Sequence, residues 1–78
     1  MYAVYVSPRD EGGRTGPRRI QSQEYILRID ALNDLLKQIE YLRKDYGCNV
    51  EENGEENYIV TSGQNIFDYC VSSTDWKL

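Results

Sequence analysis

The 78-residue sequence contains no histidine, only two cysteines and no apolar run long enough to span a membrane. Histidine is the commonest general base and metal ligand at neutral pH, so its absence excludes Ser-His-Asp and Cys-His catalytic sites in this chain. Two cysteines without histidine are too few for a structural zinc site. The stretch GGRTG at 12–16 matches neither a phosphate-binding loop nor a dinucleotide fingerprint. We therefore expect no enzymatic activity, no cofactor and no metal site.

The cysteines and the first residues both indicate a cytoplasmic protein. Cys48 and Cys70 lie far apart in apolar surroundings, and free cysteine is among the most buried residue types, so we expect two small core residues. A disulfide stays open as the alternative if the two strands that carry them are neighbours, although cytosolic thiols remain reduced. The start MYAVYVSPRD lacks the basic and then apolar pattern of a signal peptide. We expect a soluble protein with no membrane contact.

Charge is distributed unevenly along the chain, whose net charge is −4. Residues 1–30 hold five arginines against four acids, giving +1, and residues 31–78 hold four basic residues against nine acids, giving −5. The pattern predicts a molecule with one basic and one acidic end. The length predicts a single domain over residues 1–78, and a hydrophobic content of 40% is typical of a globular one.

Hydrophobic periodicity predicts an α+β fold. Alternating apolar residues indicate strands at 2–7, ended by Pro8, and at 20–29, with further strands at 48–52, 55–62 and 66–72. A short helix from about residue 65 is the alternative for the last of these. One amphipathic helix is predicted over 31–46, with Asp30 as its N-cap and Gly47 as its left-handed C-cap. Its apolar stripe consists of Leu32, Leu35, Leu36, Ile39, Leu42 and Tyr46.

The order β-β-α-β-β-β favours a two-layer sandwich. One amphipathic helix packed on an antiparallel sheet of four to five strands buries one face of that sheet. The sheet's other face would be left open. Apolar side chains on that face would then be either covered by a partner or exposed to water.

Residues 51–57, EENGEEN, combine a turn signal with four carboxylates. Asn53-Gly54 favours a tight two-residue hairpin turn, because both residues tolerate a positive φ. Like charges directly opposed across two strands destabilise a sheet. That hairpin would oppose its glutamates in two pairs, Glu52 with Glu55 and Glu51 with Glu56.

Two interpretations of the glutamates stay open. Carboxylates along a hairpin can occupy sites where a basic partner's Lys and Arg hold phosphates, and they speed association by steering. Alternatively, the charges serve only solubility and deter edge pairing. The stretch is not an EF-hand loop, because Val60 stands where the bidentate Glu is required. Clustered carboxylates still attract hard cations, so adventitious divalent binding is a further alternative.

The loop between the first two strands is rich in arginine and glycine. Arg offers bidentate recognition of phosphate or carboxylate, and long loops often carry binding residues. The alternative is a mobile, solvated surface loop. The candidate binding residues are Arg9, Arg14, Arg18 and Arg19.

Seven tyrosines exceed what a single helix can cover. Tyr41 falls off the apolar stripe, and Tyr2 and Tyr5 fall on opposite faces of the first strand. Some of these rings are therefore expected at the surface or at an interface, where Tyr, Trp and Arg are enriched. On an open sheet such rings would also stack nucleic-acid bases.

These features favour a non-catalytic protein-binding module, an inhibitor that docks on a basic nucleic-acid-binding protein or complex and blocks its nucleic-acid site. In size, charge and style the chain resembles the small acidic phage-encoded inhibitors that include anti-CRISPR proteins, although it shares no motif with them. A homo-oligomer or accessory subunit that uses an open sheet face is one alternative. A nucleic-acid-binding module is the other, with the loop arginines and Arg28 on phosphates, but the acidic pI opposes direct nucleic-acid binding.

Overall fold

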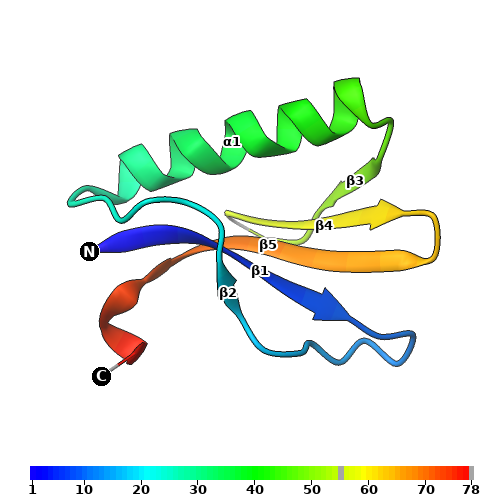
Figure 1. Cartoon of the computed structure of the whole chain (residues 1–78), viewed down its shortest axis with the longest axis horizontal. Helices are drawn as coiled ribbons and strands as arrows, with labels where there is room; N and C mark the ends of the chain where they lie inside the picture. Colours follow the sequence, from blue (N-terminus) through cyan, green and yellow to red (C-terminus); the bar gives the residue numbers. More distant parts are fainter. Residues whose placement is uncertain (55, 78) are drawn as a thin grey trace.

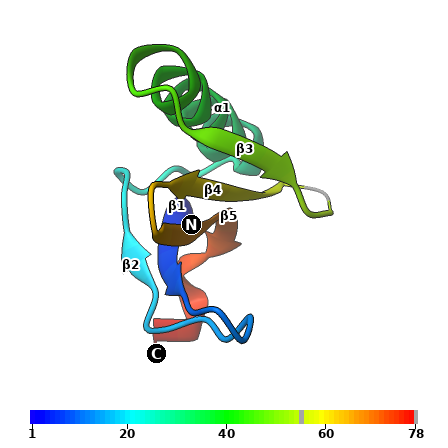
Figure 2. The same cartoon turned by 90° about the vertical axis from the view of Figure 1, so that its right-hand side faces the viewer.

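A computed structural model of the chain describes residues 1–54 and 56–77, except for the side chains of residues 76 and 77. Within these residues the strands form one five-stranded antiparallel sheet in the order β2-β1-β5-β4-β3, and helix α1 lies on one face of it (Figure 1; Figure 2). The two-layer α+β fold and the order β-β-α-β-β-β are therefore confirmed. The elements are β1 (Tyr2–Arg9), β2 (Arg19–Ile20), α1 (Arg28–Asp45), β3 (Asn49–Glu52), β4 (Asn57–Ser62), β5 (Asn65–Ser73) and the 3₁₀ helix η1 (Thr74–Lys77).

The hydrophobic core lies between α1 and strands β1, β4 and β5. Ala31, Leu35 and Ile39, each four residues after the last, form the buried row of α1. The small side chain of Ala31 lets the helix approach the sheet closely, so this row faces it. Two members of the predicted stripe are consequently misplaced: Leu36 is 42% exposed and Tyr46 is 66% exposed.

The predicted strand at 20–29 is wrong beyond its first residue, because β2 contains only Arg19 and Ile20. The chain continues beside β1, but Ser22 interrupts the backbone ladder. Its Oγ accepts the Val4 N–H at 2.9 Å, in place of a main-chain carbonyl. The ladder resumes at Tyr25, which exchanges two 2.7 Å backbone hydrogen bonds with Tyr2.

Helix α1 begins at Arg28, three residues before the predicted start. Leu27 is the N-cap residue, and its side chain makes no capping hydrogen bond. Asp30 is therefore not the N-cap. It lies in the first turn, where a negative charge still complements the helix dipole. Ile29, expected in a strand, is instead an exposed helical residue.

The end of α1 follows the sequence pattern. Gly47, just beyond the helix, has a φ of +65°, which confirms the left-handed termination. Glu40 and Lys44 form an i,i+4 ion pair at 2.7 Å, and the Lys44 hydrogen bond and charge lower the pKa of Glu40. Among the described residues, no helix combines the length and hydropathy needed to cross a bilayer.

Pro8 does not end the first strand, since β1 runs through it to Arg9 and pairs Pro8 with Phe67. The Pro8 carbonyl accepts the Gly16 N–H at 2.7 Å on the β2 side of the strand. The proline nitrogen faces the same side, beyond the two residues of β2. No ladder donor is needed there, so proline is tolerated.

The second sheet face is not left open along β1. Ala3, Tyr5 and Ser7 on that face are all buried. Arg9 and Arg18 reach residues of the neighbouring strand on the same face, and long arginine stems cover apolar surface well. The contacts are Arg9 with Asp68 at 3.2 Å and Arg18 with Ser72 at 3.4 Å.

Tyr25 ties the irregular segment to α1. Its hydroxyl donates to Asp34 Oδ2 at 2.5 Å, and this bond is the main reason that the pKa of Tyr25 is raised. Gln38 Nε2 donates to Asp34 Oδ1 and to the Gln21 carbonyl, both at 3.0 Å. The network fixes the approach to the helix.

Leu35 and Leu36 are adjacent on α1 but differ in burial, which makes a matched pair. We expect Leu35→Ala to lower the free energy of unfolding by about 3 kcal/mol, because Leu35 is 0% exposed and a cavity remains. Leu36→Ala should cost about 1 kcal/mol or less. Urea denaturation followed by circular dichroism measures both. Equal losses would contradict the observed rotation of α1.

The Tyr25 contact predicts a loss of stability at alkaline pH. The pKa of Tyr25 is raised above its ordinary 10.0, so the contact stabilises the fold below pH 10 and this contribution is lost as the pH rises through the raised pKa. Urea midpoints of wild type and Tyr25→Phe should therefore differ at neutral pH and converge in alkaline buffer. A constant difference across that range would exclude the proposed linkage.

Candidate functional site

The acidic hairpin, which we define as β3, β4 and the turn between them, has a longer turn than predicted. Glu51 lies opposite Ile59 and Glu52 opposite Tyr58, and the Asn53 N–H donates to the Asn57 carbonyl at 2.9 Å. The predicted pairing of Glu51 with Glu56 is therefore wrong. The predicted partner of Glu52, Glu55, lies outside the described residues.

The turn's backbone also differs from the expected type. Gly54 has a φ of +88° and Glu56 a φ of +57°, whereas Asn53, expected at positive φ, does not adopt it. A side chain in the left-handed region costs about 1–2 kcal/mol relative to glycine. The longer turn places Ile59 rather than Glu56 opposite Glu51, at this cost.

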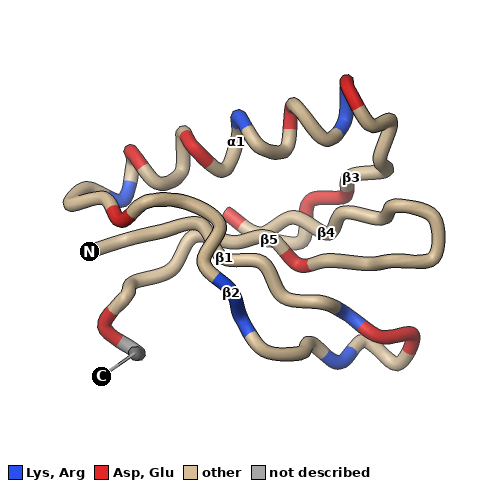
Figure 3. The backbone as a smooth tube through the Cα atoms, in the orientation of Figure 1, with Lys and Arg blue, Asp and Glu red and all other residues tan. Residues whose placement is uncertain are grey.

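Glu51 and Glu52 are both exposed on β3, the outermost strand of the sheet on this side. Neither forms an ion pair within the residues that the structure describes. Successive strand residues point to opposite faces, so Glu52 lies on the α1 side with Val50, and Glu51 lies on the other. Figure 3 shows acidic positions near the label of β3. Their charges are available to a partner on two different faces.

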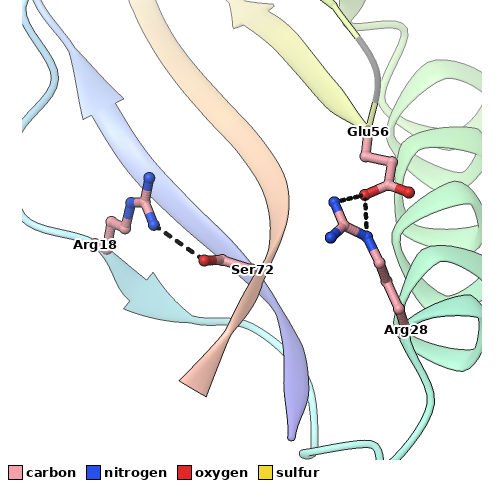
Figure 4. A network of polar contacts seen from close by, with 4 residues as sticks. All are labelled: Arg18, Arg28, Glu56 and Ser72. Carbon is pink, nitrogen blue, oxygen red and sulfur yellow. Dashed lines mark hydrogen bonds and ion pairs between the residues drawn. The ribbon is translucent and has the colours of Figure 1, made fainter. Parts of the chain in front are cut away.

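Glu56 is held by the chain itself. The Arg28 side chain donates to Glu56 Oε2 from Nε, at 2.7 Å, and from Nη2 (Figure 4). The Glu56 side chain is 22% exposed and that of Arg28 is 57% exposed. Arg28 begins α1, where a positive charge opposes the helix dipole, so Glu56 compensates an unfavourable charge. Of the four predicted glutamates, Glu56 is thus committed to an internal ion pair.

A groove of about 750 Å³ lies between α1 and the acidic hairpin. We call it the hairpin groove. Arg28, Leu32 and Leu36 follow one another at four-residue spacing and so form one row along its helical side. That four-residue spacing is the sequence pattern from which this side of the groove could be predicted. In the predicted helix, Leu32 and Leu36 belong instead to the longer apolar stripe. The groove is lined by Leu32, Leu36, Glu52, Gly54, Glu56 and Tyr58.

The four loop arginines do not form one basic surface. Arg9 and Arg18 are directed to Asp68 and Ser72, as described above. Arg14 lies in a tight turn, where its N–H donates to Asp10 Oδ1 at 2.8 Å, and both Arg14 and Arg19 are exposed. Figure 3 shows an acidic stretch that separates the first basic position of this loop from the next. Two of the four arginines are therefore occupied within the fold.

The three candidate tyrosines have different environments. Tyr2 is half-buried against the core, and Tyr5 is 1% exposed, so its ring is not offered to a partner in this structure. Tyr41 is 52% exposed and packs edge to face against Tyr46, with ring centroids 5.2 Å apart. The Tyr46 hydroxyl beside it is the main cause that raises the pKa of Tyr41.

Cys48 and Cys70 are both free thiols, so the disulfide alternative is wrong. Cys48 packs against the core, whereas Cys70 is half-buried on β5, and burial raises the pKa of its thiol. Within the described ranges, 1–54 and 56–77, no three potential metal ligands of the His, Cys, Asp or Glu type gather in one place.

The Arg28–Glu56 pair is testable by a double-mutant cycle. We expect a coupling free energy of about 0.5–1 kcal/mol between Arg28→Gln and Glu56→Gln, because the pair is partly exposed. Arg28→Gln alone should cost less than the coupling, since it also removes a charge that opposes the helix dipole. Urea denaturation in low and high salt measures the cycle. Zero coupling in low salt would show that the ion pair does not hold the turn.

Comparisons of this chain with protein-family models, with curated proteins and with solved structures find no match.

Proposed function

We propose that this chain is a non-catalytic binding protein that docks through its acidic hairpin on a basic nucleic-acid-handling protein and blocks its nucleic-acid site. The observation that supports this most is the exposure of Glu51 and Glu52, whose charges are neutralised by no ion pair among the described residues. Carboxylates at these positions would accept the bidentate arginine contacts that normally hold phosphates. This is also the style of the small acidic phage-encoded inhibitors.

The position of the hairpin at the edge of the sheet favours binding of a basic partner rather than of a second copy of this chain. The outer edge of β3 carries no paired strand within the described chain. Two copies of β3 joined edge to edge would bring Glu51 and Glu52 close to their own equivalents, and like charges disfavour such a pairing. A basic segment meets no such repulsion.

Self-association is the second candidate function, and a different surface favours it. Three apolar side chains around the start of α1 are well exposed, and Ile26 reaches 77% exposure. Contiguous apolar patches on small proteins often mark interfaces. The residues are Ile26, Leu27 and Ile29.

The docking proposal predicts a selective effect of the β3 carboxylates on capture of a partner. We expect Glu51→Gln/Glu52→Gln to weaken binding up to about 30-fold, from about 1 kcal/mol for each lost ion pair. The measurement is affinity capture from a nuclease-treated lysate of the source organism, followed by elution with a duplex oligonucleotide. A captured basic protein that the oligonucleotide elutes is the expected result, since both ligands would compete for one site.

The matched control is Glu11→Gln/Asp45→Asn, which also removes two exposed negative charges but leaves the acidic hairpin unchanged. Neither residue forms an ion pair among the described residues. This variant should capture the partner as wild type does. Equal capture by the hairpin variant, or a partner that the oligonucleotide does not displace, would refute the proposal. The molar mass of the isolated chain, measured by light scattering, distinguishes self-association from docking on a partner. A dimer that Ile26→Ser converts to a monomer would favour self-association.

A further inference from the structure

The floor of the hairpin groove is apolar and partly open to solvent. Leu32 and Leu36 contribute it from α1, and Tyr58 contributes it from β4. Leu36 is 42% exposed, although it belongs to an otherwise core-directed helix pattern. A partner atom that covers this floor would therefore bury apolar surface that the chain itself leaves uncovered.

The described side chains around the groove leave one negative charge uncompensated. Arg28 contributes +1, and Glu52 and Glu56 contribute −2, so these three side chains sum to −1. Arg28 already pairs with Glu56. Glu52 is exposed on the α1 side of β3, and no ion pair involves it within the described residues. One further cation would balance the rim.

We propose that the hairpin groove binds a single arginine side chain of the basic partner. The arginine's methylene groups would lie on Leu32 and Leu36, and its guanidinium would pair with Glu52 beside the ring of Tyr58. Arginine fits these features because it combines an apolar stem, a planar bidentate head and an affinity for aromatic rings. This inference rests on the proposed function and specifies which carboxylate and which side chain make the central contact.

The Arg28–Glu56 pair is an internal example of the same contact. Arg28 starts the helical row that Leu32 and Leu36 continue, and two of its guanidinium nitrogens donate to one Glu56 oxygen (Figure 4). A guanidinium with its stem on this side of α1 can therefore meet a hairpin carboxylate. The proposed site repeats this geometry further along the groove, at Glu52.

Glu51 and Glu52 provide a control within one strand. They are adjacent, exposed and equally charged, but only Glu52 lines the groove. The probe is an acetylated, amidated Gly-Arg-Gly peptide, titrated into the isotopically labelled full chain and followed by NMR. Its neutral counterpart carries citrulline, which keeps the shape of arginine without the charge.

We expect saturable shifts of the Leu32, Leu36 and Tyr58 amides with the arginine peptide and none with the citrulline peptide. Glu52→Gln should weaken binding about fivefold, whereas Glu51→Gln should change it less than twofold. Leu36→Ala, which leaves every charge in place, should also weaken it. Equal effects of the two glutamate substitutions, or no saturable shifts in the wild-type chain, would overturn the proposal.

The two proposals fail in distinguishable ways. If partner capture requires both glutamates equally and the peptide does not bind, docking by the hairpin stands and the groove site is wrong. If the peptide binds at Glu52 but no oligonucleotide-sensitive partner is captured, the groove is an arginine site and the nucleic-acid-blocking function is wrong.

Discussion

The rotation of α1 about its own axis is the constraint on which the surface of this protein depends. Ala31, Leu35 and Ile39 must face the sheet, because together with Val4 and Val71 they are most of the core that so short a chain can build. This requirement turns the neighbouring row, which begins at Arg28, toward the hairpin. The ion pair with Glu56 and the hairpin groove both follow from that rotation.

The interior position of β1 in the sheet has a comparable effect on the basic end of the molecule. This strand pairs with both β2 and β5 and is buried on both faces, so its second face needs a cover that one helix cannot supply. Arg9 and Arg18 reach that face and bond to β5. The sequence places five arginines in its first 30 residues, yet three of them serve internal contacts. Among the described residues, Glu51 and Glu52 of β3 are exposed and form no ion pair.

Periodicity was sufficient to predict the helix, the order of elements and the two-layer arrangement, because each depends on a repeat that local sequence carries. The prediction failed where a single side chain replaced a backbone contact. Ser22 accepts the Val4 N–H and thereby ends β2 after two residues, which no alternation of polar and apolar residues reveals. The burial of Tyr5 was equally hidden, since it depends on side chains that are distant in sequence.

The glutamate hairpin shows the same limit at the candidate site. Asn53-Gly54 is a strong local signal for a two-residue turn, but the turn extends to residue 56 and so avoids the predicted pair of Glu51 and Glu56. Repulsion between opposed glutamates disfavours the two-residue turn, and the observed register places Ile59 rather than Glu56 opposite Glu51. The local turn signal does not show that a residue at position 56 would adopt a positive φ.

Glu56 is the turn residue that adopts the strained positive φ, and its carboxylate also lines the hairpin groove. Glycine would fit a φ of +57° without strain, so glutamate costs about 1–2 kcal/mol there. The ion pair with Arg28 offsets part of that cost. With glycine at this position, Arg28 and Glu52 alone would sum to zero charge at the rim. With glutamate there, Arg28, Glu52 and Glu56 sum to −1, so the strained residue neutralises Arg28 and leaves the negative charge of Glu52 for a cation.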